Sequence, residues 1–249
     1  MKLSGYTVTR DCVSGDYCFE ECIRSLSAIC DEVVVADAMS EDGTRERIAS
    51  LVCELGNVRV VNYPREDLFN DRGFFTRWLN YTRLQLTGDI QLQLDADEVF
   101  DTDSRDYIRM LAEHGRPYWC RRLNFWGDHR HYAPSGVVCG DRVVRLAPAR
   151  YWMPSDEGHV PEVPIRLDAR DGGPVVYHYG FIRHANGFLK KSEWFQQALV
   201  GDFDKRLKRA KETGEDWRIL APCPATPVPY NGPHPRIAHN WLRARGYIP

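Results

Sequence analysis

Two aspartates near position 95 stand at the end of a stretch that alternates apolar and polar residues. Residues 90–94 have the period of a strand with one apolar face. If that strand continues, Asp95 and Asp97 project to the same side, about 6–7 Å apart. Two carboxylates so placed repel each other unless a divalent cation or a cluster of donors lies between them. Oxygen-only ligands favour Mg²⁺, Mn²⁺ or Ca²⁺ over zinc, so the stretch predicts a metal site open to a ligand such as a diphosphate.

An acidic pair after a strand also occurs as a plain turn or as the start of a helix. An EF-hand loop is excluded, because Phe100 stands at the sixth position from Asp95, where the sharp turn needs Gly. Support for a metal site therefore has to come from other parts of the chain.

The first hundred residues alternate between strand and helix patterns. The patterns predict strands at 6–9, 33–36, 58–61 and 90–94, and helices within 16–30, 44–55 and 75–86. This alternation predicts an α/β fold with a mainly parallel sheet and right-handed crossovers. Ligands of such sheets bind beyond the carboxyl ends of the strands, which is where Asp37 and residues 95–98 fall.

Three motifs in this half resemble glycosyltransferase family 2, whose members have the GT-A fold. Residues 30–44, CDEVVVADAMSEDGT, resemble the second-strand signature of the family. Residues 77–80, RWLN, resemble its Arg/Asn element, which lies on the helix before the DxD strand. Residues 94–98, LDADE, resemble the DxD motif itself. Residues 175–180, VVYHYG, resemble the short strand that carries a C-terminal metal-binding histidine. The resemblance is best over residues 5–100. It implies a Rossmann-like, mainly parallel central sheet flanked by helices, with a mixed second half.

The resemblance also implies roles for individual residues. Asp37 would accept a hydrogen bond from the nucleotide base, commonly uracil, and Asp95 would contact the ribose or a metal-bound water. Asp97 and His178 would hold a divalent metal, Mn²⁺ or Mg²⁺, at the diphosphate of a nucleoside-diphosphate sugar. The donor-binding residues implied in this way are Thr9, Arg10, Asp37, Asn80, Asp95 and Ala96. Residues 9–12 depart from the family, because they lack its usual Asn-rich loop.

An inverting enzyme of this family also needs a general base for the acceptor hydroxyl. The candidates lie in the acid-rich, Pro-punctuated stretch 153–162. Asp156 and Glu157 are the predicted catalytic residues, with a slight preference for Asp156, and Glu162 is a third possibility. A solvated loop without a catalytic role is the alternative.

The second half has a less regular pattern. It predicts a helix at 105–114, strands at 119–125 and 142–146, and an irregular Pro-rich segment at 222–235. Arg142 and Arg145 cannot share one face of a strand, so at most one of them serves the site. Residues 232–235, GPHP, resemble a C-terminal element near the active-site mouth of some family relatives, with a structural turn as the alternative for His234.

The expected organisation is a single GT-A-like domain over residues 1–249. Residues 1–100 would form the nucleotide-sugar-binding half, and residues 101–249 an acceptor-binding half with a C-terminal extension.

The composition sets further limits. A net charge of −2 and a pI near 6.5 give no general reason to expect binding to nucleic acid or to an anionic membrane. Neither a signal peptide nor an apolar run long enough for a membrane span is recognisable, and the eight cysteines form no CxxC pair. These features predict reduced thiols and a soluble, cytoplasmic protein without a transmembrane segment.

The sequence as a whole therefore predicts a metal-dependent, inverting glycosyltransferase that uses a UDP-sugar. The acceptor stays open between a glycan, a lipid-linked precursor, a protein and a hydroxylated base in DNA. For DNA, the basic stretch 205–211 and the aromatic stretch 124–132 would be the contacts. A nucleotidyltransferase is a second possibility, although residues 9–15 hold only one Gly and one Arg where it needs a Gly-rich, basic phosphate loop. A non-catalytic nucleotide-sugar-binding module is a third.

Overall fold

The protein is described by a computed structural model over residues 1–64, 74–134, 142–149, 170–184, 187, 190, 212–213 and 225–249. The first half contains β1 (Leu3–Thr9), α1 (Phe19–Ile29), β2 (Glu32–Asp37), α2 (Thr44–Leu55), β3 (Val58–Asn62), α3 (Phe74–Arg83) and β4 (Ile90–Gln93). This order confirms the predicted alternation of strands and helices.

The second half is mixed. It contains β5 (Glu98–Phe100), the 3₁₀ helix η2 (Thr102–Ser104), α4 (Arg105–Glu113), β6 (Tyr118–Trp126), β7 (His131–Tyr132), β8 (Arg142–Pro148), β9 (Val176–Phe181), β10 (Val228–Pro229), η4 (Arg236–Ala238) and α8 (His239–Arg243). The described part of the predicted Pro-rich segment contains only the short strand β10.

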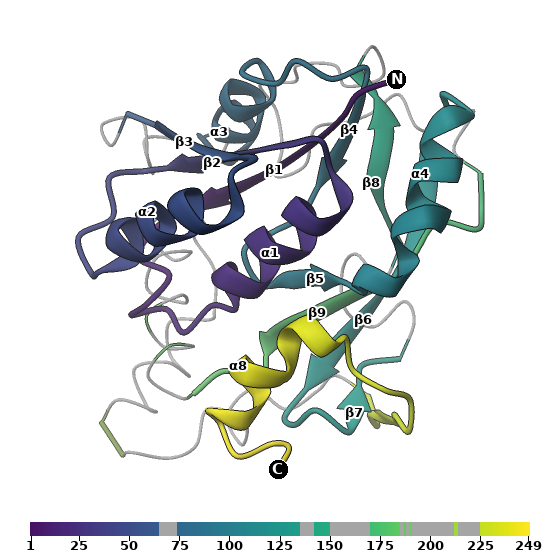
Figure 1. Ribbon diagram of the computed structural model, residues 1–249. Helices are drawn as coiled ribbons and strands as arrows, with labels where there is room; N and C mark the ends of the chain where they lie inside the picture. The colour runs from purple at the N-terminus through teal and green to yellow at the C-terminus, as the bar shows by residue number, and fades with distance from the viewer. Residues whose placement is uncertain are drawn as a thin grey trace.

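The central sheet has the strand order β3-β2-β1-β4-β8-β6-β7-β10, and β9 pairs with both β5 and β6. Strands β1 to β4 run parallel, β8 is antiparallel to its neighbours β4 and β6, and β9 runs parallel to β6 but antiparallel to β5. The predicted α/β fold with a mostly parallel sheet flanked by helices is confirmed (Figure 1).

Strand β2 shows why the apolar run 33–36 forms a central strand. Val33 and Val35 pack with residues of α1, α2 and α4 on one face of the sheet. Val34 and Ala36 pack with residues of α3 on the other face. Because both faces are covered by helices, all four positions of the run 33–36 are apolar.

Asp95 and Asp97 do not lie on a continuation of β4, so of the alternatives that the sequence left open the turn is the one found. Strand β4 ends at Gln93, and residues 95–98 form a turn in which the amide of Glu98 donates to the carbonyl oxygen of Asp95 at 2.9 Å. The amide of Asp95 in turn donates to the Glu98 carboxylate at 2.9 Å. This reciprocal pair of hydrogen bonds favours a turn over a continued strand.

In the part of the chain that the structure describes, none of the helices has the length and apolar character needed to cross a membrane.

Candidate functional site

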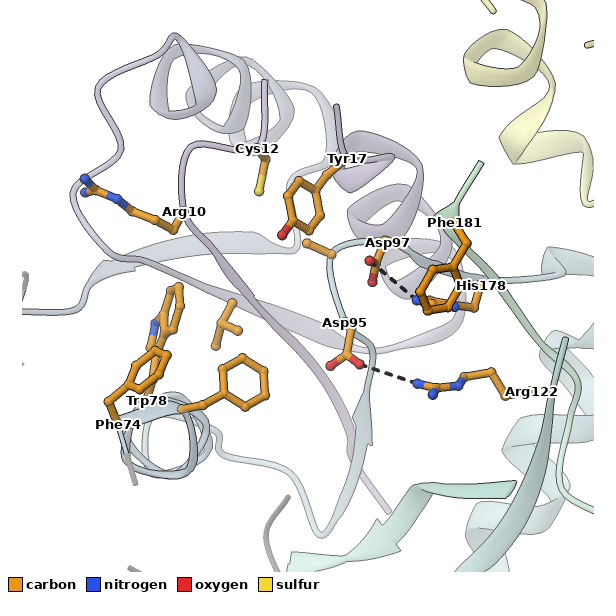
Figure 2. A pocket seen from close by; sticks show the side chains of 13 residues that line it. Arg10, Cys12, Tyr17, Phe74, Trp78, Asp95, Asp97, Arg122, His178 and Phe181 are labelled. Carbon is orange, nitrogen blue, oxygen red and sulfur yellow. Dashed lines mark ion pairs between the residues drawn. The ribbon is translucent and has the colours of Figure 1, made fainter. Parts of the chain in front are cut away.

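Strand pairing brings Asp97 and His178 together. Strands β5 and β9 pair antiparallel with Glu98 opposite His178, and the amide of Tyr179 donates to the carbonyl oxygen of Asp97 at 2.9 Å. As a result Asp97 Oδ2 lies 3.5 Å from His178 Nε2, although the two residues are far apart in the sequence (Figure 2). Both side chains are buried, and burial lowers the pKa of His178. A neutral imidazole is the form that can bind a metal.

Gly180 keeps a space open beside these two donors. A Cβ atom at this position would lie 2.5 Å from His178 Nε2 and 2.7 Å from Asp97 Oδ2. An imidazole nitrogen and a carboxylate oxygen are ligands that Mn²⁺ accepts, and bonds of about 2.0–2.2 Å would fit between them. The donor set therefore suits a divalent cation whose remaining ligands come from a substrate. Among the described residues, no group of three or more His, Cys, Asp and Glu side chains could hold a metal by itself.

Asp95 is held by an arginine and a glutamine. Its Oδ2 lies 2.8 Å from Arg145 Nη2, and its Oδ1 accepts a hydrogen bond of 2.8 Å from Gln93. Burial acts to raise the pKa of Asp95, but the charges of Arg145 and Arg122 outweigh it and the pKa is lowered. Asp95 is thus a carboxylate that stays ionised and accepts hydrogen bonds.

Glu98 is fully buried under this turn. It lies 2.6 Å from Arg145 Nη2 and 3.1 Å from Arg122 Nη1. Arg145 therefore contacts two of the three acids. The sequence allowed at most one of Arg142 and Arg145 to serve the site. Arg145 pairs with the acids of the turn, and the side chain of Arg142 lies outside the described residues.

Asp97 has an arginine partner of its own. Arg183, two residues after β9, contacts Asp97 Oδ2 through Nη2 and donates through Nη1 to the carbonyl oxygen of Gly15 at 3.0 Å. Its guanidinium lies 3.5 Å from the centroid of the Tyr17 ring. Sequence reasoning missed Arg122 and Arg183, because each pairs with an acid that only the fold brings near.

A cavity of about 260 Å³ lies at the carboxyl ends of β1 and β4. One end is apolar and aromatic, and the other carries the acids, as Figure 2 shows. The apolar end is lined by Val8, Phe74, Phe75 and Trp78, and the polar end by Asp95, Asp97, Arg122 and His178. This division suits a ligand with a flat ring at one end and anionic oxygens at the other.

The cavity wall includes some of the predicted donor-binding residues but not all. Arg10, Asp95, Ala96, Asp97 and His178 line it. The guanidinium of Arg10 also donates to the carbonyl oxygens of residues 38 and 39, which fixes the loop after β2.

Asp37 lies behind this wall and is fully buried. Its Oδ1 accepts hydrogen bonds from the hydroxyls of Thr9 at 3.0 Å and Ser40 at 2.6 Å. Its Oδ2 accepts from the Ser40 amide at 2.9 Å and from Arg45 Nη1 at 3.1 Å. Thr9 and Asn80 are likewise not among the described residues that line the cavity. The predicted general bases Asp156, Glu157 and Glu162 lie outside the described residues.

His234 belongs to a cluster of rings that includes Phe125, His129 and Tyr179. Its Nε2 donates to the carbonyl oxygen of His129 at 2.9 Å, and the hydroxyl of Tyr179 donates to its Nδ1 at 3.0 Å. The ring also lies 4.7 Å, centroid to centroid, from Phe125. Burial lowers the pKa of His234 to about 4, so the ring is neutral at pH 7 and makes these two hydrogen bonds.

The mostly parallel central sheet flanked by helices matches the GT-A fold. Among solved structures, TarS of S. aureus matches with a TM-score of 0.50 at 14% identity, over 85% of this chain and 42% of TarS. The chain thus spans well under half the length of that protein. TarS 1-349 in complex with UDP-GlcNAc matches with a TM-score of 0.49 at 16% identity, over 86% of this chain and 73% of that one.

Glucosyl-3-phosphoglycerate synthase of Mycobacterium tuberculosis, in complex with Mn²⁺, UDP and glucosyl-3-phosphoglycerate, matches with a TM-score of 0.44 at 14% identity, over 81% of each chain. These structure neighbours are glycosyltransferases of the GT-A type. No family model matches the sequence, and no curated protein is significantly similar to it. The likeness to TarS, with a TM-score of 0.50 at 14% identity, shows a shared fold.

Proposed function

We propose that this protein is a metal-dependent, inverting glycosyltransferase whose donor is a nucleoside-diphosphate sugar, in the first instance a UDP-sugar. The observation that carries the proposal is the pair Asp97 and His178, 3.5 Å apart at the polar end of a cavity whose other end is aromatic. UDP is chosen because TarS, whose fold is similar, has been crystallised with UDP-GlcNAc.

The two ends of the cavity would bind different parts of the donor. Phe75 and Trp78 offer apolar ring surface for the nucleotide base. Asp95, kept ionised by Arg145, would accept hydrogen bonds from sugar hydroxyls. Asp37 would read the base only if its carboxylate exchanged one of its present partners, such as Arg45.

Asp97 and His178 would hold the divalent cation, Mn²⁺ or Mg²⁺. When bound, this ion would act as a Lewis acid that stabilises the negative charge of the departing nucleoside diphosphate. Arg122 lines the same end of the cavity and adds a fixed positive charge near the diphosphate.

The transfer itself needs a base on the acceptor side. Asp156, or else Glu157 or Glu162, is proposed to take the proton of the acceptor hydroxyl. The hydroxyl oxygen then bonds to the anomeric carbon from the face opposite the diphosphate, while the bond from that carbon to the diphosphate oxygen breaks. One displacement from the opposite face inverts the configuration at the anomeric carbon.

The test is a thermal-shift titration with UDP, GDP, TDP and CDP, each with and without Mn²⁺. Ligands that bind only the folded state raise its melting temperature. We expect one nucleotide, UDP, to give a shift that needs Mn²⁺ in the wild type and is absent in Asp97→Asn. The matched control is Asp31→Asn, which also removes a carboxylate paired with an arginine, Arg109 at 3.0 Å, but outside the site.

Each other outcome would point elsewhere. In a parallel titration with the four nucleoside triphosphates, a shift with a triphosphate and with none of the diphosphates would favour a nucleotidyltransferase. A metal-dependent UDP shift without hydrolysis or transfer of any UDP-sugar would favour a binding module. No shift with any nucleotide in the wild type would refute the proposed donor site.

A further inference from the structure

Asp97 already has a cation at its carboxylate, the guanidinium of Arg183. The side chain of Arg183 is only 1% exposed, and it is fixed by the Gly15 carbonyl oxygen at 3.0 Å and by the Tyr17 ring at 3.5 Å. Its contact is with Oδ2, the same carboxylate oxygen that faces His178 Nε2. A cation held between Asp97 Oδ2 and His178 Nε2 therefore shares this oxygen with Arg183.

The charges around the acidic turn are balanced by arginines. The three acids of the turn are Asp95, Asp97 and Glu98, and each lies within 4 Å of at least one guanidinium. The three guanidiniums belong to Arg122, Arg145 and Arg183. Three negative charges and three positive charges leave these described groups without a net charge, so a divalent cation arriving alone gains little electrostatic attraction.

A diphosphate changes this balance because it brings negative charge of its own. A cation that draws on Asp97 weakens the hold of that carboxylate on Arg183, and a buried guanidinium without a counter-ion is costly. A diphosphate beside the cation supplies a new counter-charge for both. The free-energy cost of weakening the Asp97–Arg183 pair is therefore present when the cation binds by itself, and it is offset when the cation and the diphosphate bind together.

We infer that Arg183 couples the two ligands: it opposes binding of a divalent cation alone at Asp97 and favours binding of the cation together with a diphosphate. The inference rests on the proposed function, and it assigns to Arg183 a positioning role that acts through Asp97. Coupling of this kind is reciprocal, so Mn²⁺ should raise the affinity for UDP by the same factor as UDP raises the affinity for Mn²⁺.

The experiment measures Mn²⁺ binding by the decrease of the free Mn²⁺ signal in electron paramagnetic resonance, with no nucleotide, with uridine and with UDP. The decrease that UDP causes without protein is measured separately and subtracted, because the diphosphate itself binds Mn²⁺. In the wild type we expect UDP to tighten Mn²⁺ binding by about tenfold or more. Uridine, which lacks the diphosphate, should have no effect. This part of the test needs no variant.

The variant is Arg183→Met, which keeps an unbranched side chain but removes the charge. It should bind Mn²⁺ alone about tenfold more tightly than the wild type, and the effect of UDP should shrink correspondingly. Arg183→Lys keeps the charge and should retain most of the coupling. The matched control is Arg245→Met, because Arg245 also pairs with an aspartate, Asp16, and lies 3.6 Å from an aromatic ring, that of Trp241. This control should behave as the wild type.

The possible failures are distinguishable. If Arg183→Met leaves both affinities unchanged while UDP still tightens Mn²⁺ binding in the wild type, Arg183 does not couple the ligands and the inference is wrong, while the proposed function stands. If the wild type binds Mn²⁺ equally well with and without UDP, the two ligands are not coupled, which refutes the metal-dependent donor site and the inference with it. If the wild type binds no Mn²⁺ even with UDP, the proposed function is refuted and the inference with it.

Discussion

Replacing Gly180 with Ala should weaken metal-dependent nucleotide binding without unfolding the protein. Residue 180 lies in β9 and does not have a positive φ, so its backbone conformation is open to alanine. The added Cβ would lie 2.5 Å from His178 Nε2 and 2.7 Å from Asp97 Oδ2, which is 0.5 Å and 0.3 Å closer than the 3.0 Å limit for real Cβ contacts. Both side chains therefore have to move apart, and they are the proposed metal ligands.

The added methyl group has two effects, one on the folding free energy and one on the affinity for UDP with Mn²⁺. Overpacking by one methyl group in a buried site costs about 1–3 kcal/mol of folding free energy. Displacing the proposed metal ligands, Asp97 and His178, by several tenths of an ångström should also weaken binding of UDP with Mn²⁺ to the protein by about tenfold or more. A loss of this size is typical when the residues that hold metal ligands in place are mutated. At a UDP concentration of 100 times the wild-type Kd, the ligand stabilises the protein by about 2.7 kcal/mol, and a tenfold loss of affinity reduces this to about 1.4 kcal/mol. For a chain of this length, that difference lowers the ligand-induced shift by about 3–5 °C.

The assay is the thermal shift produced by UDP with Mn²⁺, compared with the melting temperature of the same variant without ligand. Gly5→Ala is the matched control, because its Cβ would also be crowded, at 3.0 Å from Cys30 Sγ and 3.3 Å from Leu26, but in β1 away from the site. It should lower the melting temperature and keep the full UDP–Mn²⁺ shift. A full shift in Gly180→Ala would refute the assignment of the space between Asp97 and His178 to a cation.

Two further predictions concern stability. Asp37→Asn should lower the free energy of unfolding, measured in urea titrations, by about 2 kcal/mol. The reason is that an amide cannot accept all the hydrogen bonds that Ser40 and Arg45 donate to the buried carboxylate. An unchanged free energy of unfolding would show that these contacts contribute little. The pKa of His234 is about 4 in the folded protein, against an ordinary value of 6.5, so the unfolded state takes up the proton first as the pH falls. The stability contributed by neutral His234 should therefore be fully present above pH 6.5 and decrease between pH 6.5 and 4. His234→Gln should reduce this decrease in urea titrations at pH 7.5 and 5, and an identical pH dependence in variant and wild type would contradict the reasoning.

The parts of the fold that the sequence predicted are those that depend on local patterns. The run 33–36 predicted a strand covered on both faces, and β2 is such a strand. Helices α1 to α3 follow the apolar spacing that predicted them. These elements follow from periodicity because each one buries a face defined within a dozen residues.

The sequence pattern left two features of the site undecided: the turn at 95–98, which rests on a contact three residues apart, and the side-chain pairs, which depend on partners far away in the chain. The turn at 95–98 is closed by a hydrogen bond between the Asp95 amide and the Glu98 carboxylate, which an alternating pattern does not reveal. Arg122 and Arg183 lie 24 and 86 residues from the acids to which they are hydrogen-bonded, Glu98 and Asp97. The approach of Asp97 and His178 was implied by the family resemblance, since nothing local connects the two residues.

The arginines have a consequence for how the protein can be divided. All three acids of the turn lie before residue 101, and their guanidinium partners Arg122, Arg145 and Arg183 all lie after it. A fragment of residues 1–100 would therefore keep a cluster of negative charges and lose the counter-ions described for it, together with β8, which covers the open edge of β4. Exchanging this half between related proteins would require the three arginine positions to be transferred with it, so the unit of recombination is larger than the unit that carries the motifs of residues 30–44, 77–80 and 94–98.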